Sequence, residues 1–132
     1  MRKKQEKIVR VFIVDDSAIL RERLITMVSE LKGIEIIGQA KGSTEAVEAI
    51  PKLKPDVVIL DIRMHGGNGI EVLKSIKKDK NPPLVIMLTN YPYPQYRKKC
   101  KDAGADFFLD KSTEFEKITG ILNNLAKRRG ES

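Results

Sequence analysis

Five polar residues stand beside apolar stretches of the chain, and their chemical types suit work on a phosphoryl group. They are Asp15, Asp16, Asp61, Thr89 and Lys111. Three carboxylates brought together raise one another's pKa, and a hard divalent cation such as Mg²⁺, which prefers oxygen ligands, relieves their repulsion. The metal and the lysine would neutralise phosphoryl oxygens, and the threonine would donate a hydrogen bond. Asp61 could then act as a nucleophile and form an aspartyl-phosphate.

The stretch that carries Asp61 begins with a charge, continues as four apolar residues over 57–60 and ends on the aspartate. A continuous apolar run rich in β-branched residues predicts a strand buried on both faces, as in a parallel sheet. Ligands of open α/β sheets bind outside the carboxyl ends of the strands, where Asp61 would lie. A single aspartate at a strand end more often caps the next turn, so the functional interpretation depends on the other four residues.

The chain as a whole repeats the order strand then helix five times. We expect strands over 8–14, 34–40, 56–61, 84–88 and 106–110, and helices over 18–32, 43–53, 70–78, 95–103 and 113–126. Crossovers of this length imply a parallel sheet with helices on both faces, which is the α/β class. Glycines predict a loop over 64–69. Pro51 and Pro55 predict the end of the second helix, and Thr113 to Glu116 predicts a capping box.

Length and composition limit the class of protein. The 132 residues predict one domain over 1–132, with a core at about 8–125 and frayed termini, the tail fraying from Lys127. Cys100 is the single cysteine, which excludes a disulfide within the chain and favours a reducing compartment, the cytoplasm. It stands on an apolar helix stripe, so we expect it in the core. No apolar run approaches about 20 residues, so no membrane span is expected.

The charge pattern and the single histidine exclude further classes of site. The net charge is +7, but the basic residues are dispersed and aromatic residues make up 5% of the chain. This pattern favours solvated helix faces over direct nucleic-acid binding. His65 is the only histidine, which excludes most multi-histidine metal sites, and we expect it to be an exposed loop residue near the acidic cluster.

In order and spacing, these motifs resemble the receiver domain of two-component response regulators. The resemblance covers about residues 8–125. It is carried by Val14-Asp15-Asp16, Leu60-Asp61-Ile62-Arg63-Met64, Leu88-Thr89 and Asp110-Lys111. The Lys111-Ser112 pair is similar to that of receivers attached to LuxR-type helix-turn-helix output domains. The resemblance implies a flavodoxin-like, doubly wound, five-stranded parallel sheet with order 2-1-3-4-5 and five helices.

The resemblance also implies a role for each site residue. Asp61 would be the phosphoacceptor, and Thr89 and Lys111 would contact the phosphoryl group. The ligands of Mg²⁺ would be Asp15, Asp16, Asp61 and the backbone carbonyl of Arg63. A sensor histidine kinase would be the phosphodonor. The domain would be no enzyme beyond promoting its own phosphorylation and dephosphorylation.

The same resemblance implies where the signal leaves the domain. The surface would be the helix at 95–103, the fifth strand and the last helix, with Phe108 rotating inward when Thr89 moves. Phe108 stands where related domains often carry tyrosine, so any switch there depends on packing alone. The partner at this face would be an output domain, a downstream protein or a second copy of the chain.

Three other functions are disfavoured by single features of the sequence. A phosphatase of the haloacid dehalogenase type needs an aspartate two residues after the nucleophile, where this chain has Arg63. A nucleotide or flavin binder needs a glycine-rich loop after the first strand, where this chain has Asp15 and Asp16. A degenerate receiver that only binds proteins would not need the intact set of acids, threonine and lysine.

Overall fold

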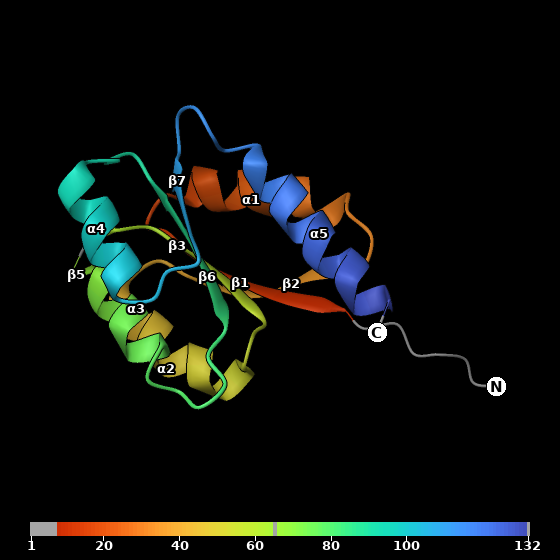
Figure 1. The fold of residues 1–132 in the computed structure, drawn as a ribbon, viewed down its shortest axis with the longest axis horizontal. Coiled ribbons are helices and arrows are strands. Elements are labelled where there is room, and N and C mark those ends of the chain that lie inside the picture. Colours follow the sequence, from red (N-terminus) through yellow and green to blue (C-terminus); the bar gives the residue numbers. More distant parts are fainter. Residues whose placement is uncertain (1–7, 65, 132) are drawn as a thin grey trace.

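The structure, a computed structural model, describes residues 8–64 and 66–131 (Figure 1). His65 lies outside the described residues. Five strands form one parallel sheet in the order β2-β1-β3-β6-β7. They are β1 (Val9–Val14), β2 (Ile34–Ala40), β3 (Val57–Leu60), β6 (Leu84–Thr89) and β7 (Phe107–Asp110). In chain order of these strands this is 2-1-3-4-5, so the expected flavodoxin-like sheet is confirmed.

Helices connect the strands and cover both faces of the sheet. They are α1 (Ala18–Ser29), α2 (Ser43–Leu53), α3 (Gly69–Ile76), α4 (Pro94–Asp102) and α5 (Lys117–Glu131). In Figure 1, α1 and α5 lie over one face, while α2, α3 and α4 lie over the other. The five helices in the described part of the chain agree with the expected doubly wound α/β fold.

Alternation along the strands divides the core into two layers. Phe12, Val58 and Met87 belong to the layer under α2, α3 and α4, whereas Ile13 and Ile59 belong to the layer under α1 and α5. All four residues of β3 are buried, as a continuous apolar run in a central parallel strand requires. The strand ends that carry the polar residues therefore extend from a sheet that is packed on both faces.

The segment expected to be a loop over 64–69 contains a short antiparallel hairpin of β4 (Arg63–Met64) and β5 (Gly67–Asn68). The Asn68 side chain accepts a hydrogen bond from the Ile70 amide at 2.7 Å and caps α3. At Gly69, a Cβ would collide with the Asp61 carbonyl. Glycine at this position therefore lets the start of α3 approach the acidic residue closely.

One of these two helix ends differs from the expectation and the other agrees with it. α1 ends at Ser29, before Gly33, which lies in the turn to β2 with a φ of 78°. α2 ends at Leu53 as expected, with Pro51 inside the helix and Lys54 capping it in the left-handed conformation. The Lys54 amide still donates to the Ile50 carbonyl at 2.8 Å. That bond closes the last turn of α2, so Pro51 does not terminate the helix.

The start and end of α5 also correct the expectation. The capping box at Thr113 is wrong, because α5 begins at Lys117. The Glu114 carboxylate instead accepts a hydrogen bond from the Asp110 amide at 2.9 Å. At the other end, α5 is helical to Glu131, so the fraying expected from Lys127 is wrong. None of the helices in the described part of the chain has the length and apolarity that a bilayer span requires.

Candidate functional site

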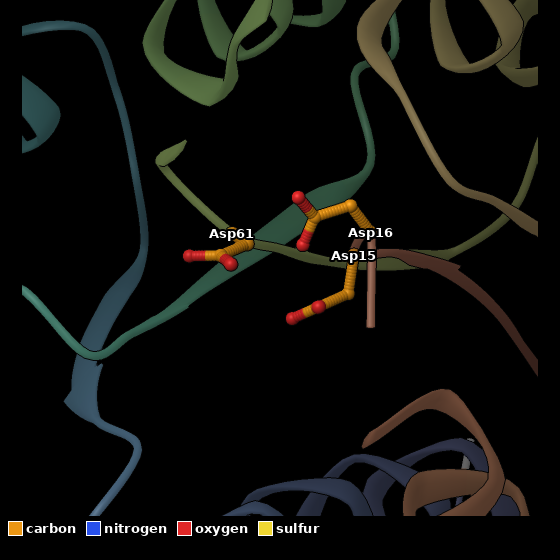
Figure 2. A group of neighbouring side chains, drawn as sticks. All are labelled: Asp15, Asp16 and Asp61. Atoms are coloured by element: carbon orange, nitrogen blue, oxygen red, sulfur yellow. The ribbon is translucent and has the colours of Figure 1, made fainter. Parts of the chain in front are cut away.

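Three aspartates meet at the carboxyl ends of two neighbouring strands. Asp15 and Asp16 follow β1, and Asp61 follows β3, which pairs in parallel with β1. One carboxylate oxygen from each of the three lies within 4.8 Å of the others, and Figure 2 shows the three side chains next to one another. Asp15 and Asp61 are 2% and 5% exposed, whereas Asp16 is exposed. The structure therefore brings together the three acids that the sequence singled out.

Lys111 reaches this cluster from the end of β7. Its Nζ atom donates to Asp15 Oδ2 at 2.8 Å and to Asp61 Oδ2 at 3.1 Å. Its backbone amide donates to the Thr89 carbonyl at 2.8 Å, which ties the end of β7 to the end of β6. Thr89 is fully buried, and its hydroxyl oxygen accepts a hydrogen bond from the Tyr91 amide at 3.0 Å. All five expected site residues thus lie at one edge of the sheet.

Local hydrogen bonds fix the direction of the two buried carboxylates. Asp15 Oδ1 accepts from the Ser17 amide at 2.9 Å, and the Ser17 hydroxyl caps α1 by accepting from the Leu20 amide at 3.2 Å. Asp61 Oδ1 accepts from the Ile62 amide at 2.7 Å. Each of these carboxylates has one oxygen held by the backbone and the other bound to Lys111.

Burial and charge change the protonation of the site. Burial raises the pKa of Asp61, Lys111 opposes this change, and the neighbouring Asp15 carboxylate adds to it, so that the pKa is about 6. Burial by itself would lower the pKa of Lys111, but its hydrogen bonds and charge contacts with Asp15 and Asp61 hold that pKa above its ordinary value. Lys111 therefore stays charged. Ionising Asp61 in the folded protein costs free energy, and a bound cation would lower that cost.

The donor set suits a hard metal ion. The three aspartates offer carboxylate oxygens, and Asp16 leaves one side of the cluster exposed. Hard cations such as Mg²⁺ or Ca²⁺ bind oxygen ligands of this kind better than soft metals do. Among the residues that the structure describes, the oxygens of Asp15, Asp16 and Asp61 lie close enough together to share one ion. The arrangement can bind a cation and present one carboxylate, Asp61, to an anionic ligand.

A cluster of side chains beside the site was not predicted. The Arg63 guanidinium lies 4.3 Å from the centroid of the Tyr91 ring, and its Nη2 atom is 3.4 Å from the Tyr96 hydroxyl. The resemblance assigned Arg63 only a backbone role. The signal in the sequence was the group of three tyrosines over 91–96, which begins two residues after Thr89.

Two residues outside the acidic cluster also have defined surroundings. Cys100 is fully buried, and burial raises the pKa of its thiol to about 11, which confirms it as a core residue. Phe108 is partly buried against the layer under α2, α3 and α4, and the Arg97 guanidinium covers its ring at 4.5 Å. Phe107 and Leu109 alternate to the other face, as expected for a strand.

Known proteins resemble the chain in sequence and in fold. The family model described as response regulator receiver domain matches residues 11–123. The sensory transduction protein LytT of Bacillus anthracis is 34% identical over 120 residues, which are 91% of this chain and 48% of LytT. The chain spans about half the length of the LytT proteins that it matches.

Two solved structures extend the comparison to three dimensions. A DNA-binding response regulator of the LuxR family from Staphylococcus aureus is 28% identical, with a TM-score of 0.82, over 90% of this chain and 99% of that one. CheY of Borrelia burgdorferi, in a complex with CheX, beryllofluoride and Mg²⁺, is 30% identical, with a TM-score of 0.73, over 85% of this chain and 87% of that one.

Proposed function

The chain belongs to the family of response regulator receiver domains, and on that premise we propose that Asp61 accepts a phosphoryl group from a sensor histidine kinase. A receiver domain is a phosphoacceptor module of two-component signalling and not an enzyme with its own small-molecule substrate. The observation that carries the assignment of Asp61 is its position. Asp15 is also buried and bound to Lys111, but Asp61 is the acid that has these contacts at the end of the central strand β3.

The surroundings of Asp61 support its role as the nucleophile. One of its carboxylate oxygens would form a bond to phosphorus while the bond from phosphorus to the leaving nitrogen or oxygen of the donor breaks. The leaving group would keep the electron pair. Lys111, 3.1 Å from Asp61 Oδ2, would offset charge on the phosphoryl oxygens. The Thr89 hydroxyl, whose oxygen already accepts a hydrogen bond from the Tyr91 amide, would donate a hydrogen bond to them.

We assign the metal ion as Mg²⁺, held by Asp15, Asp16 and Asp61 with the backbone carbonyl of Arg63. Three carboxylate ligand atoms within 4.8 Å of one another fit such an ion. When bound, Mg²⁺ supplies positive charge that neutralises phosphoryl oxygens. The similar CheY forms its complex with beryllofluoride in the presence of Mg²⁺, which supports the choice of metal.

The output would leave through α4, β7 and α5. α4 contributes one buried side chain, Cys100, to the core, so it is held less firmly than α3, which has five buried residues. Its outer face carries Arg97, Lys98 and Lys101, a basic surface suited to an acidic partner or to a second copy of the chain. An attached or separate output protein is an alternative occupant. With its buried thiol at Cys100, the domain would function in the reducing cytoplasm, where the kinase delivers the phosphoryl group.

Phosphorylation by a small donor tests the assignment. Acetyl phosphate with Mg²⁺ should add one phosphoryl group to the wild-type protein, measured by intact mass, and Asp61→Asn should abolish the addition. Asp56→Asn is the matched control, because Asp56 lies at the opposite edge of the sheet. Lys111→Ala should still accept the group but show a smaller change in amide exchange on α4, β7 and α5. Full labelling of the Asp61→Asn protein would refute the proposal.

A further inference from the structure

All three tyrosines of the protein gather beside the acidic site, and the chain contains no tryptophan. Tyr91 and Tyr93 lie in the connection from β6 to α4, and Tyr96 lies in the first turn of α4. The ring centroids of Tyr91 and Tyr93 are 6.2 Å apart, and those of Tyr93 and Tyr96 are 5.6 Å apart. The intrinsic tyrosine fluorescence of the whole protein therefore reports on this one group, which we call the tyrosine cluster.

Arg63 joins the tyrosine cluster to the loop that follows Asp61. Arg63 stands two residues after Asp61, and its backbone lies in β4, where it pairs with Asn68. Its side chain crosses to the connection between β6 and α4, with the guanidinium 4.3 Å from the Tyr91 ring centroid and Nη2 3.4 Å from the Tyr96 hydroxyl. A cation over an aromatic face is attracted by the ring quadrupole, so this contact holds two separate loops together.

The backbone of Tyr91 continues this connection into the site. Its amide donates to the Thr89 hydroxyl oxygen at 3.0 Å, and that bond determines where the hydroxyl proton can point. A shift of Tyr91 therefore moves the hydrogen-bond donor that orients Thr89. The contacts form a continuous path from the loop after Asp61, through Arg63 and Tyr91, to the Thr89 hydroxyl.

We propose that Arg63 is a positioning residue, whose side chain holds Tyr91 so that the Tyr91 amide keeps the Thr89 hydroxyl oriented for the phosphoryl group. This inference deepens the proposed function and depends on it. By ordering the connection between β6 and α4 before the ligand arrives, Arg63 lowers the conformational cost of binding. When the Thr89 hydroxyl turns to a phosphoryl group on Asp61, the Tyr91 amide and ring move with it, and the tyrosine cluster changes its environment.

Two measurements on each variant test this role. Beryllofluoride with Mg²⁺ serves as the phosphoryl mimic, and half-saturation is read from the thermal midpoint and, separately, from tyrosine fluorescence. In Arg63→Ala we expect the half-saturating beryllofluoride concentration to rise about five-fold or more and the fluorescence change to shrink. Arg63 is exposed, so its removal should leave the fold intact, which far-UV circular dichroism checks.

Three further variants separate positioning from general structure. Tyr91→Phe keeps the ring face under the guanidinium and should bind the mimic nearly as the wild type does, whereas Tyr91→Leu should resemble Arg63→Ala. Arg23→Ala removes a contact of the same kind, with the guanidinium 4.2 Å from the Phe115 ring centroid, but touches no tyrosine. It should leave the half-saturating concentration unchanged.

The outcomes distinguish failure of the proposed function from failure of the role of Arg63. If the wild type shows no thermal shift with the mimic, both the proposed function and the role of Arg63 fail. If the wild type binds but Arg63→Ala binds equally well or more tightly, the positioning role is wrong while the proposed function stands. The same holds if Tyr91→Phe loses as much affinity as Tyr91→Leu.

Discussion

At the amino ends of its strands the sheet carries Asp56 and Asp106, and at the carboxyl ends it carries Asp15 and Asp61. Asp56 binds the Arg10 amide and the Arg129 guanidinium, each at 2.8 Å. Asp106 Oδ2 binds the Val85 amide at 2.8 Å and Lys77 Nζ at 2.9 Å. We call this the amino edge. Each of its acids has a cation and a backbone donor of its own.

The carboxyl edge is arranged differently. Asp15 and Asp61 share the ammonium of Lys111, and Asp16 lies within reach of the same oxygens. Like charges at close range and burial both disfavour ionisation there. The amino edge thus uses carboxylates to secure strand ends, while the carboxyl edge keeps an excess of negative charge that a cation and a phosphoryl group can use. The difference marks one edge as structural and the other as functional.

The two edges should respond to loss of a carboxylate with opposite signs. At pH 7 without divalent metal, Asp61→Asn should raise the free energy of unfolding by about 1–3 kcal/mol, because it removes a buried charge that is costly to ionise. Asp106→Ala should lower it by about 1–3 kcal/mol, because the buried Val85 amide loses its acceptor and the Lys77 ammonium loses its carboxylate partner. Urea denaturation of both variants measures this. A decrease in both would show that the edges do not differ.

The pH dependence of stability should identify the same excess charge. The pKa of Asp61 is raised in the folded protein from its ordinary value of 3.8 to about 6, so the folded state binds the proton more tightly than the unfolded state. Its contribution to stability is complete below about pH 4 and is lost as pH rises through about 6. In metal-free protein, the stability difference between Asp61→Asn and wild type should therefore grow over this interval. A constant difference would contradict the raised pKa.

A divalent cation should stabilise the carboxyl edge only. At a Mg²⁺ concentration ten times its dissociation constant, linkage adds about 1.4 kcal/mol to the free energy of unfolding, which scanning calorimetry detects as a higher midpoint. Asp16→Asn should weaken this response. Asp56→Asn, which changes an acid at the amino edge, should keep it. An equal rise of the midpoint in the two variants would mean that the ion does not bind at Asp15, Asp16 and Asp61.

The smallest effect is expected at the end of α5. The Arg129 and Asp56 side chains are 38% and 25% exposed, and exposed ion pairs contribute little. Arg129→Ala should therefore lower the free energy of unfolding by less than about 1 kcal/mol, measured by urea denaturation. The rise in the thermal midpoint on adding Mg²⁺ should equal that of the wild type. A different rise would show that the amino edge and the carboxyl edge are coupled.

Much of the fold was predictable because local patterns determine it. The apolar runs at β3 and β6 predicted buried strands, and the structure has them at Val57–Leu60 and Leu84–Thr89. Polar residues directly after such runs must meet at one edge of a parallel sheet, so the convergence of Asp15 and Asp61 was also predictable. The strand order required the family resemblance, since pairing of distant strands is not encoded in any local period.

The predictions that were wrong or missing concern side chains that can bind either a neighbour in the sequence or a residue far along the chain. Thr113 and Glu116 fit a capping box by spacing, but α5 begins only at Lys117, and Glu114 binds the Asp110 amide in the turn before it. The last turn of α5 looked like a frayed tail, but Arg129 binds Asp56 across the fold. The contact of Arg63 with Tyr91 depends on two loops meeting beside the sheet. Spacing along the sequence does not report such contacts.

The most direct measurement locates the phosphoryl group on the chain. After reaction with acetyl phosphate and Mg²⁺, borohydride reduces an acyl phosphate on aspartate to homoserine, and peptide mass spectrometry identifies the residue changed. Our account predicts homoserine at position 61 alone, with Asp15, Asp16 and Asp56 unchanged. Homoserine at any of these other positions, or labelling spread among them, would contradict the claim that the buried carboxylate after β3 is the phosphoacceptor.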